Sequence, residues 1–442
     1  MHIENIGESI HKNFSLEQIL ILGYNSSMID IQIVRDNPDL VRQKSSQKGY
    51  EIDIDKLLQL DAERRDLQKT VEELRTRRNL VAETMKNSGG KPDEQAIEEG
   101  KLLKIELSER EEYLAKTSEE FNQLLSLIPN LHDNDVPLGD EDASVQIKTY
   151  GDQPTGAEDH LDFALRKDWV DFERGTKVAG SKFYYLKGDL ALLENAIYQY
   201  ALDFVVKKGV NFMTVPHMVS GKIASGTGFT PRTSDQSDEY FIENEDLSLI
   251  ATAEIPLTGY HADEIIDESK LPLLYAAYSP CYRKEAGTYG KHARGLFRVH
   301  QFNKLEMYAY TLPEKSREMH EQILAIEEEI WQSLSIPYRV INIASGDLGA
   351  PAAKKYDIEY WSKVDGKYCE LTSCSNCTDY QARNLNIRAR RADGRIENVH
   401  TLNGTVVALA RSLIAIIEHY QDDQDLVIPE VLRPYMSGRE RI

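Results

Sequence analysis

Two stretches in the first third of the 442-residue chain carry apolar residues at alternating spacings of three and four. They cover residues 55–85 and 103–128, and the segment 87–92 (NSGGKP) lies between them. This heptad spacing places the apolar residues on one face of a helix. Because Gly and Pro interrupt helices, the pattern predicts two long helices that form an antiparallel hairpin. The heptad positions are Leu57, Leu60, Arg64, Leu67, Val71, Leu74, Arg78, Val81 and Met85, then Leu103, Leu107, Arg110, Leu114, Thr117, Phe121, Leu124 and Ile128.

Each predicted helix of about 30 to 35 residues would be roughly 50 Å long, so the hairpin would project from a globular body as an arm. Residues 62–86 hold seven Lys or Arg against five Asp or Glu. A slightly basic arm suits a phosphate backbone, although a solvated coiled-coil face has the same mixture of charges. The basic residues are Arg64, Arg65, Lys69, Arg75, Arg77, Arg78 and Lys86.

The composition excludes several classes of protein. With 41% hydrophobic and 28% charged residues, the chain is globular rather than disordered. No run approaches about eighteen apolar residues, so no membrane span is expected. The net charge of −21 argues against an indiscriminate nucleic-acid binder. Four cysteines do not make a disulfide framework, and residues 1–27 lack the basic segment of a secretory signal, so we expect a cytoplasmic protein.

The rest of the chain predicts an α+β fold. Residues 131–156, rich in Asp, Gly and Pro, are expected to be a linker. Beyond them, long helical patterns alternate with short strands, without the βαβ alternation of a parallel sheet, which favours an antiparallel sheet flanked by helices. Predicted helices cover residues 189–208, 313–334 and 405–420, and predicted strands include 338–343 and 356–361.

A hairpin near the middle of the chain carries the most informative polar residues. Arg283 and Glu285 are two apart, a Gly-rich segment follows at 286–295, and an alternating segment returns at 298–306. In a strand, residues two apart share a face, so this arginine and this glutamate could reach one site. An arginine fork suits a phosphate, whereas a surface salt bridge is the alternative for an isolated pair.

The stretch YRKEAGTYGKHARGLFRVHQFNKLE resembles motif 2 of class II aminoacyl-tRNA synthetases, in the form that seryl-tRNA synthetases carry. The resemblance extends from about residue 28 to the end of the chain. It implies an N-terminal coiled-coil arm that grips the long variable arm of tRNA(Ser), and a catalytic domain that activates serine with ATP. The implied domains are 28–135 for tRNA binding and 136–442 for catalysis, after an extension of unknown role at 1–27 that could also reflect an upstream start codon.

Activation of an amino acid joins two anions, so it needs positive charge rather than a general base. The resemblance implies that Arg283 contacts the α-phosphate of ATP, that Glu285 lies near the adenine and that Phe302 stacks on it. The segment NGTVVALAR at 403–411 resembles motif 3, whose arginine, here Arg411, contacts the γ-phosphate. Val406 and Ala410 stand where many members have Gly, and we expect their side chains to narrow the space near ATP. The implied ATP-binding residues are Arg283, Lys284, Glu285, Val299, His300, Gln301, Phe302, Glu370, Leu371, Thr372, Ser373 and Arg411.

The segment ELTSCSNC at 370–377 is similar to the family segment that binds ATP and its magnesium. A carboxylate beside hydroxyl groups suits a hard cation that keeps some of its water, which makes Glu370 and Ser373 candidate Mg²⁺ ligands. Cys374 and Cys377 could instead suggest zinc, but one C-x-x-C without a second pair is incomplete, so buried structural thiols are favoured.

The serine pocket is also implied by the resemblance. Thr252, Ala253 and Glu254 match the family's T-x-E segment, and Glu306 and Thr405 match its other serine contacts. Alanine would leave buried polar groups unpaired at about 1 to 3 kcal/mol each, so it would be rejected strongly. Threonine would be excluded only by lack of room for its methyl group.

Residues 209–216 (GVNFMTVP) resemble motif 1, which implies a homodimer. Two other functions are also compatible with parts of the sequence. A catalytically silent relative could bind tRNA through the arm, but it would have no need for the charges at Arg283, Glu285, Glu306, Glu370 and Arg411. A synthetase-like enzyme could load amino acids onto a carrier protein, but such relatives lack the arm and use a Cys/His zinc site. Charging of tRNA(Sec) is a further expectation where that tRNA is present.

Overall fold

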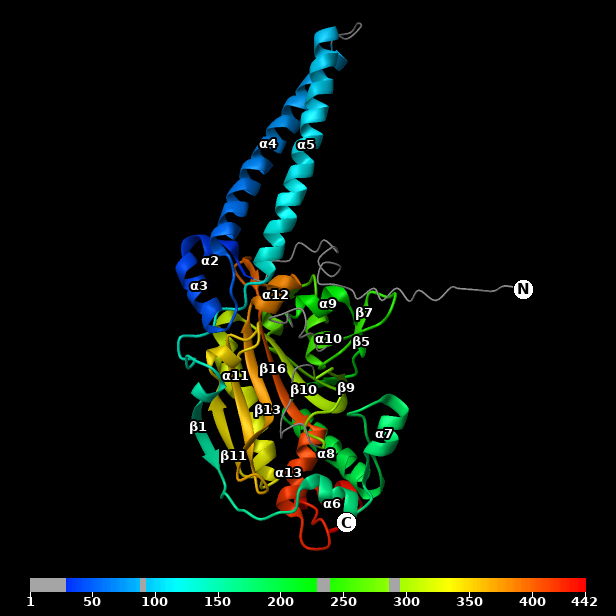
Figure 1. Cartoon of the computed structure of the whole chain (residues 1–442). Coiled ribbons are helices and arrows are strands. Elements are labelled where there is room, and N and C mark those ends of the chain that lie inside the picture. Colours follow the sequence, from blue (N-terminus) through cyan, green and yellow to red (C-terminus); the bar gives the residue numbers. More distant parts are fainter. Residues whose placement is uncertain (1–28, 88–92, 229–238, 286–294) are drawn as a thin grey trace, which may run out of the picture.

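The computed structural model describes residues 29–87, 93–228, 239–285 and 295–442. Figure 1 shows two long helices that project side by side from the rest of the molecule, with two short helices at their base and the main sheet beyond. The extension at 1–27, residues 88–92 and most of the Gly-rich segment 286–295 lie outside the described residues.

The arm consists of α4 (Ile54–Asn87) and α5 (Glu94–Ser126), which confirms the predicted helical hairpin. The short helices α2 (Ile31–Asp36) and α3 (Pro38–Gln47) pack against its base. Leu74, Leu103 and Leu107 are buried between the two helices, and Leu57 and Leu60 are buried in the cluster with the short helices at the base. Leu125 is fully buried there, whereas Leu124 is only partly buried. Arg64 contributes to the seam differently, since its guanidinium covers the ring of Phe121 at 4.5 Å.

An eight-stranded sheet forms the centre of the part of the chain that follows the arm. Its order is β1-β11-β12-β13-β16-β10-β9-β4, and every pair is antiparallel except β4 with β9. The strands are β1 (Val145–Tyr150), β4 (Asn211–Met213), β9 (Leu273–Tyr282), β10 (Gln301–Thr311), β11 (Tyr338–Asn342), β12 (Lys354–Ser362), β13 (Lys367–Thr378) and β16 (His400–Ala408). The predicted antiparallel α+β fold is therefore confirmed.

Helices cover one face of this sheet. The main core joins Leu305 and Met307 of β10 to apolar residues of α8 (Gly188–Lys207), α11 (Ser316–Ser333) and α13 (Leu409–Tyr420). Because side chains alternate along a strand, Glu306 and Tyr308 lie on the opposite face. That face packs against α10 (Glu254–Gly259) and α12 (Tyr380–Asn384), so it is the face available for a polar site.

Smaller elements complete the fold. Three small sheets have the orders β15-β14-β8, β2-β3 and β5-β7-β6. Their strands are β2 (Val170–Asp171), β3 (Tyr185–Leu186), β5 (Met218–Ser220), β6 (Tyr240–Phe241), β7 (Leu247–Leu249), β8 (Ile265–Asp267), β14 (Arg388–Arg390) and β15 (Ile396–Asn398). The remaining α-helices of the described residues are α6 (His160–Arg166), α7 (Phe172–Ala179) and α9 (Gly221–Gly226). Every described helix is too short or too polar to cross a lipid bilayer.

Three sequence-based boundaries need correction. The residues predicted to begin a helix at 405 belong to β16 up to Ala408, since Thr405 and Val407 pair with β10 and Val406 is the extra residue at the register shift between them. The predicted linker contains β1, an exposed strand that pairs with β11 at the edge of the sheet. Strand β9 ends at Tyr282, so Arg283 and Glu285 do not share a strand face.

Candidate active site

A small cavity of about 90 Å³ lies where the ends of β9, β10, β13 and β16 meet the start of α13. It gathers residues that the sequence places far apart. The predicted site residues that line it are Arg283, Glu285, Val299, Phe302, Glu370, Leu371, Thr372, Ser373, Thr405 and Arg411. The cavity is also lined by Ala410, which the sequence analysis named as a departure from motif 3, and by Leu296, Phe297, Lys304 and Ala408, which it did not single out.

Arg283 is held in the cavity wall by its backbone and by its side chain. Its N–H donates to the carbonyl oxygen of His300 over 3.0 Å, which continues the β9–β10 pairing by one step. Its guanidinium lies 5.2 Å from the centroid of the Phe302 ring, and its Nε donates to the Ala251 carbonyl oxygen over 3.3 Å. The cation and the ring therefore face the same space.

Glu285 reaches the cavity by a turn of the chain rather than by strand alternation. Its φ angle of 49° lies in the left-handed region, which few non-glycine residues adopt. Strained backbone of this kind often occurs at functional sites. The carboxylate pairs with Arg298 over 3.0 Å, so a second motif 2 cation lies beside it.

Arg411 enters from the first turn of α13 and pairs with Glu370 of β13 over 2.9 Å. The N-terminus of a helix attracts anions through its free N–H groups and its dipole, which adds to the positive charge of this arginine. The Glu370 side chain is 43% exposed, so its carboxylate remains accessible from the cavity. This end of the cavity thus combines one cation with one reachable carboxylate.

The electrostatics around Glu370 favour its ionised form. Burial alone would raise its pKa, but Arg411, Lys355 and Arg283 together hold the pKa below the ordinary value. On the neighbouring strand, burial raises the pKa of Asp357 to about 7, although Lys355 lies 3.2 Å away and opposes the shift. In the described ranges, no group of three His, Cys, Asp or Glu side chains could hold a metal ion.

The predicted serine contacts on β10 and β16 form a compact polar group. A register shift between Leu305 and Glu306 places Thr405 opposite Glu306. Thr405 Oγ1 donates to Glu306 Oε2 over 3.3 Å, and Lys304 Nζ lies 2.6 Å from the same oxygen. Because all three residues are buried, their polar atoms depend on each other and on a ligand for hydrogen bonds.

Glu254 lies at the start of α10 and is also buried. Its Oε1 accepts hydrogen bonds from Gln381 over 2.8 Å and from Asn403 over 2.9 Å. Burial and the charge of Glu306 raise the pKa of Glu254 to about 7. Thr252 Oγ1 accepts from the backbone N–H of Glu254 over 3.2 Å, so Thr252 supports the local turn.

Some predicted ATP-binding residues lie outside the cavity lining. The ammonium of Lys284 packs over the rings of Tyr240 and Phe241 at 5.8 and 5.5 Å. His300 Nδ1 contacts the carbonyl oxygen of Arg283 at 2.9 Å, and the side chain of Gln301 is exposed at the start of β10. His300 therefore positions Arg283 through its backbone.

The departures from the glycine-rich form of motif 3 have different consequences. Val406 is fully buried in the main core and does not line the cavity, because the register shift turns it toward the helices. Ala410 does line the cavity. Of the two side chains, only that of Ala410 therefore lies where it could narrow the cavity.

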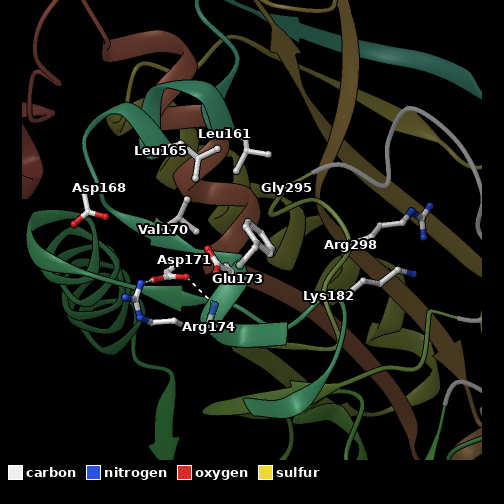
Figure 2. Close-up of a pocket in the computed structure, with 11 residues that line it drawn as sticks. Leu161, Leu165, Asp168, Val170, Asp171, Glu173, Arg174, Lys182, Gly295 and Arg298 are labelled. Atoms are coloured by element: carbon white, nitrogen blue, oxygen red, sulfur yellow. Dashed lines mark hydrogen bonds and ion pairs between the residues drawn. The ribbon is translucent and has the colours of Figure 1, made fainter. Parts of the chain in front are cut away.

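A larger cleft of about 500 Å³ lies beside α6 and α7 (Figure 2). Figure 2 shows Lys182 and Arg298 on one side of it and the Asp171–Arg174 ion pair on the other. Of the predicted site residues, none lies in its lining. Volume is therefore a poorer guide to this site than the convergence of charged and aromatic residues.

Sequence reasoning missed several polar residues of the site. Arg298, Lys304, Gln381 and Asn403 contact predicted residues directly. Arg298 and Lys304 belong to the motif 2 hairpin, so strand alternation could have found Lys304 beside Glu306. Gln381 lies 127 residues from its partner Glu254 in the sequence, and no local pattern indicates that contact.

The arm, the antiparallel sheet and a cavity with one arginine on each of two distant segments define a class II aminoacyl-tRNA synthetase. Consistent with this, residues 238–420 match the family model of the tRNA synthetase class II core domain (G, H, P, S and T). Residues 28–132 match the seryl-tRNA synthetase N-terminal domain. The chain belongs to the seryl-tRNA synthetase family.

Relatives resemble the chain over nearly its whole length. The serine–tRNA ligase of Dictyoglomus turgidum is 48% identical over 93% of this chain and 99% of its own length. The serine–tRNA ligase of Rubrobacter xylanophilus is 43% identical over 94% of this chain and 99% of its own length. The crystal structure of seryl-tRNA synthetase from Pyrococcus horikoshii complexed with ATP has a TM-score of 0.85 at 39% identity and covers 94% of this chain and 99% of its own.

Proposed function

We propose that this chain is a serine–tRNA ligase. It would activate L-serine with ATP to give seryl-adenylate and pyrophosphate, and then transfer serine to the 3′ end of tRNA(Ser). The observation that carries the proposal is the convergence of Arg283, Arg411 and Glu370 on one cavity, next to the buried group of Glu306 and Thr405. One part of the site suits a nucleotide and the other a small hydroxylated amino acid.

The two arginines would neutralise the phosphates in the activation step. A serine carboxylate attacks the α-phosphate, a P–O bond to pyrophosphate breaks, and charge builds on the leaving group. Arg283 beside Phe302 suits an α-phosphate next to a stacked adenine, and Arg411 at the N-terminus of α13 suits the terminal phosphate. Arg283 is already held by the Ala251 carbonyl oxygen and the Phe302 ring, so little reorganisation of this cation is needed.

Glu370 and Ser373 would hold Mg²⁺ together with the phosphates of ATP. Magnesium in nucleotide sites commonly takes one or two carboxylates plus substrate oxygens, which fits a partly exposed glutamate without a complete protein cage. The ion would supply positive charge to the phosphates. Arg411, now paired with Glu370, would turn to the terminal phosphate when ATP is bound.

The polar group on β10 and β16 would recognise the serine side chain. A serine hydroxyl can donate to Glu306 and accept from a neighbouring donor, whereas alanine would leave Glu306 and Thr405 without that partner. Glu254 would face the α-ammonium, with Thr252 and Ala253 shaping the turn that holds it.

The arm would bind tRNA(Ser), and tRNA(Sec) where it is present. Its basic residues differ in their availability. Arg64 and Arg65 pair with buried Asp61 at the base of the arm, and Arg75 and Arg77 pair across the arm with Glu111 and Glu99. Lys69 and Arg78 are exposed, and among the described residues they form no ion pair, so they are the strongest candidates for phosphate contacts.

A homodimer through the motif 1 region and a cytoplasmic location complete the proposal. Leu192 and Val206 of α8 and Phe212 of β4 are exposed apolar side chains near the end of the large sheet. A second copy would cover them.

All four cysteines are buried and free, which suits a reducing compartment.

Serine-dependent exchange of labelled pyrophosphate into ATP tests the activation step. We expect exchange with serine, at least 100-fold less with alanine, and charging of tRNA(Ser) by the full chain. Deletion of residues 55–128 with a short linker should preserve exchange and abolish charging. Absence of serine-dependent exchange would overturn the enzyme assignment, and charging that survives the deletion would overturn the role of the arm.

A further inference from the structure

Gln381 occupies a fully buried position on α12 behind the serine pocket. Its Oε1 accepts from the hydroxyl groups of Tyr308 over 2.8 Å and Thr401 over 2.7 Å. Its Nε2 donates to the Thr227 carbonyl oxygen over 3.1 Å and to Glu254 Oε1 over 2.8 Å. All four hydrogen-bonding directions of the amide are thereby used.

The orientation of this amide is determined by its partners. The Thr227 carbonyl oxygen can only accept, as can Glu254 when it is ionised, so the side of the amide that faces them must carry the NH₂ group. The opposite side faces two hydroxyl groups, which can donate. A flipped amide would place its oxygen against two acceptors, at the cost of two buried hydrogen bonds. Gln381 therefore presents a fixed N–H group to Glu254.

Asn403 of β16 adds a second donor to the same oxygen, over 2.9 Å. The other charged groups around Glu254 are on β10, where Lys304 pairs with Glu306. In the described part of the chain, Glu254 forms no ion pair. Burial without a cation destabilises an ionised carboxylate, and the N–H donors of Gln381 and Asn403 partly offset this destabilisation.

We propose that Gln381, together with Asn403, is a positioning residue of the amino-acid pocket: the two amides hold Glu254 Oε1 and direct Oε2 toward the α-ammonium of the substrate. The inference rests on the proposed function of Glu254. The ammonium then becomes the counterion that Glu254 lacks. Gln381 acts on the substrate through Glu254 and does not contact the reacting atoms.

This role differs from that of an ordinary core hydrogen bond. The bonds to Tyr308, Thr401 and Thr227 stabilise α12 whether or not substrate is present. The bond to Glu254 acts on a charged group that a substrate must meet. Loss of Gln381 should therefore change the binding of serine and leave the binding of ATP unaffected, since ATP lies at the Phe302 end of the cavity.

Pyrophosphate exchange by the Gln381→Met variant tests the proposal. Methionine fills a similar volume without a donor, and Asn384→Leu is the matched control, because Asn384 also lies on α12, is buried and donates one hydrogen bond, to the Gly226 carbonyl oxygen over 2.9 Å. We expect Gln381→Met to raise the KM for serine at least 10-fold and to change the KM for ATP less than 2-fold. Partial unfolding would lower the apparent kcat but not either KM.

The pH profile supplies a second readout. Removal of one N–H donor destabilises the ionised form of Glu254, so the acid limb of kcat/KM for serine should move to higher pH by about one unit in Gln381→Met. Asn384→Leu should not move it. An unchanged KM for serine and an unchanged acid limb, or an equal rise in the KM for ATP, would overturn the proposal. Exchange by the unmodified chain tests the proposed function separately.

Discussion

At the scale of single residues, Arg283 is the cation whose removal should cost the most activity. We expect Arg283→Ala to lower serine-dependent pyrophosphate exchange about 100- to 1,000-fold or more, because a fixed charge aimed at the transition state contributes about 3 to 4 kcal/mol. Arg395→Ala is the control, since Arg395 lies on the surface and pairs with Asp393. Exchange at a normal rate in a folded Arg283→Ala protein would contradict the assigned role.

The buried side chain of Glu418 should make the free energy of unfolding depend on pH. Burial raises its pKa to about 7, against the effect of hydrogen bonds from Ser362, Tyr360 and the backbone of Lys363. The folded chain therefore keeps a proton that the unfolded chain releases above its ordinary pKa of 4.5. Glu418 therefore contributes to the free energy of unfolding below about pH 4.5, and this contribution decreases as the pH rises through about 7.

Denaturant unfolding of the unmodified chain and of Glu418→Gln should reveal this difference. Between pH 5 and 8, the free energy of unfolding of the unmodified chain should fall by about 3 kcal/mol more than that of the variant, because each pKa unit is worth about 1.4 kcal/mol. Parallel pH profiles of the two proteins would show that Glu418 titrates normally.

At the scale of secondary structure, Lys48 connects the arm domain to the catalytic domain. It follows α3 and is fully buried, and its Nζ donates to the carbonyl oxygens of Asn130, Ala350 and Ala352 over 2.9 to 3.1 Å. We expect Lys48→Met to destabilise this joint, since each buried carbonyl left unpaired costs about 1 to 3 kcal/mol. Hydrogen exchange should show lost protection around residues 349–353 and at the base of α4.

Arg42→Met on α3 is the control for Lys48→Met. Arg42 forms ion pairs with Asp39 and Asp55 at the surface, where such pairs contribute little. Its hydrogen-exchange pattern should match that of the unmodified chain. Equal protection in the Lys48→Met and Arg42→Met proteins would mean that the joint does not depend on the buried ammonium.

The elements differ in how far the sequence could predict them. The helices of the arm follow from heptad spacing, because a helix buried on one side repeats its apolar residues regularly. The boundary between β16 and α13 does not, because residues 405–417 are almost continuously apolar and buried both as strand and as helix. Motif resemblance indicated the charged residues of the cavity, whereas Lys48 and Gln381 depend on contacts between distant segments.

At the scale of the whole molecule, charge is distributed unevenly. The chain carries a net charge of −21, but residues 62–86 are slightly basic and extend away from the acidic body. An acidic surface repels the tRNA backbone, and residues 62–86 of α4 are a slightly basic stretch within it, beside the acidic helix α5. Asp61 of α4 also pairs with Arg35 of α2 over 2.8 Å, and this ion pair joins the base of the arm to the short helices.

The end of the large sheet predicts how two copies associate. Strand β4 is the last in the strand order, and Phe212 is exposed there. Sheet edges that carry apolar side chains usually pair or are covered.

We expect light scattering to give twice the chain mass of 50.4 kDa for the unmodified protein. Phe212→Asp should yield the single-chain mass at low micromolar concentration, because burial of a carboxylate without a partner is unfavourable. Tyr113→Asp, on the exposed arm, should remain dimeric. A single-chain mass for the unmodified protein would contradict the dimer, and a dimeric Phe212→Asp variant would place the interface elsewhere.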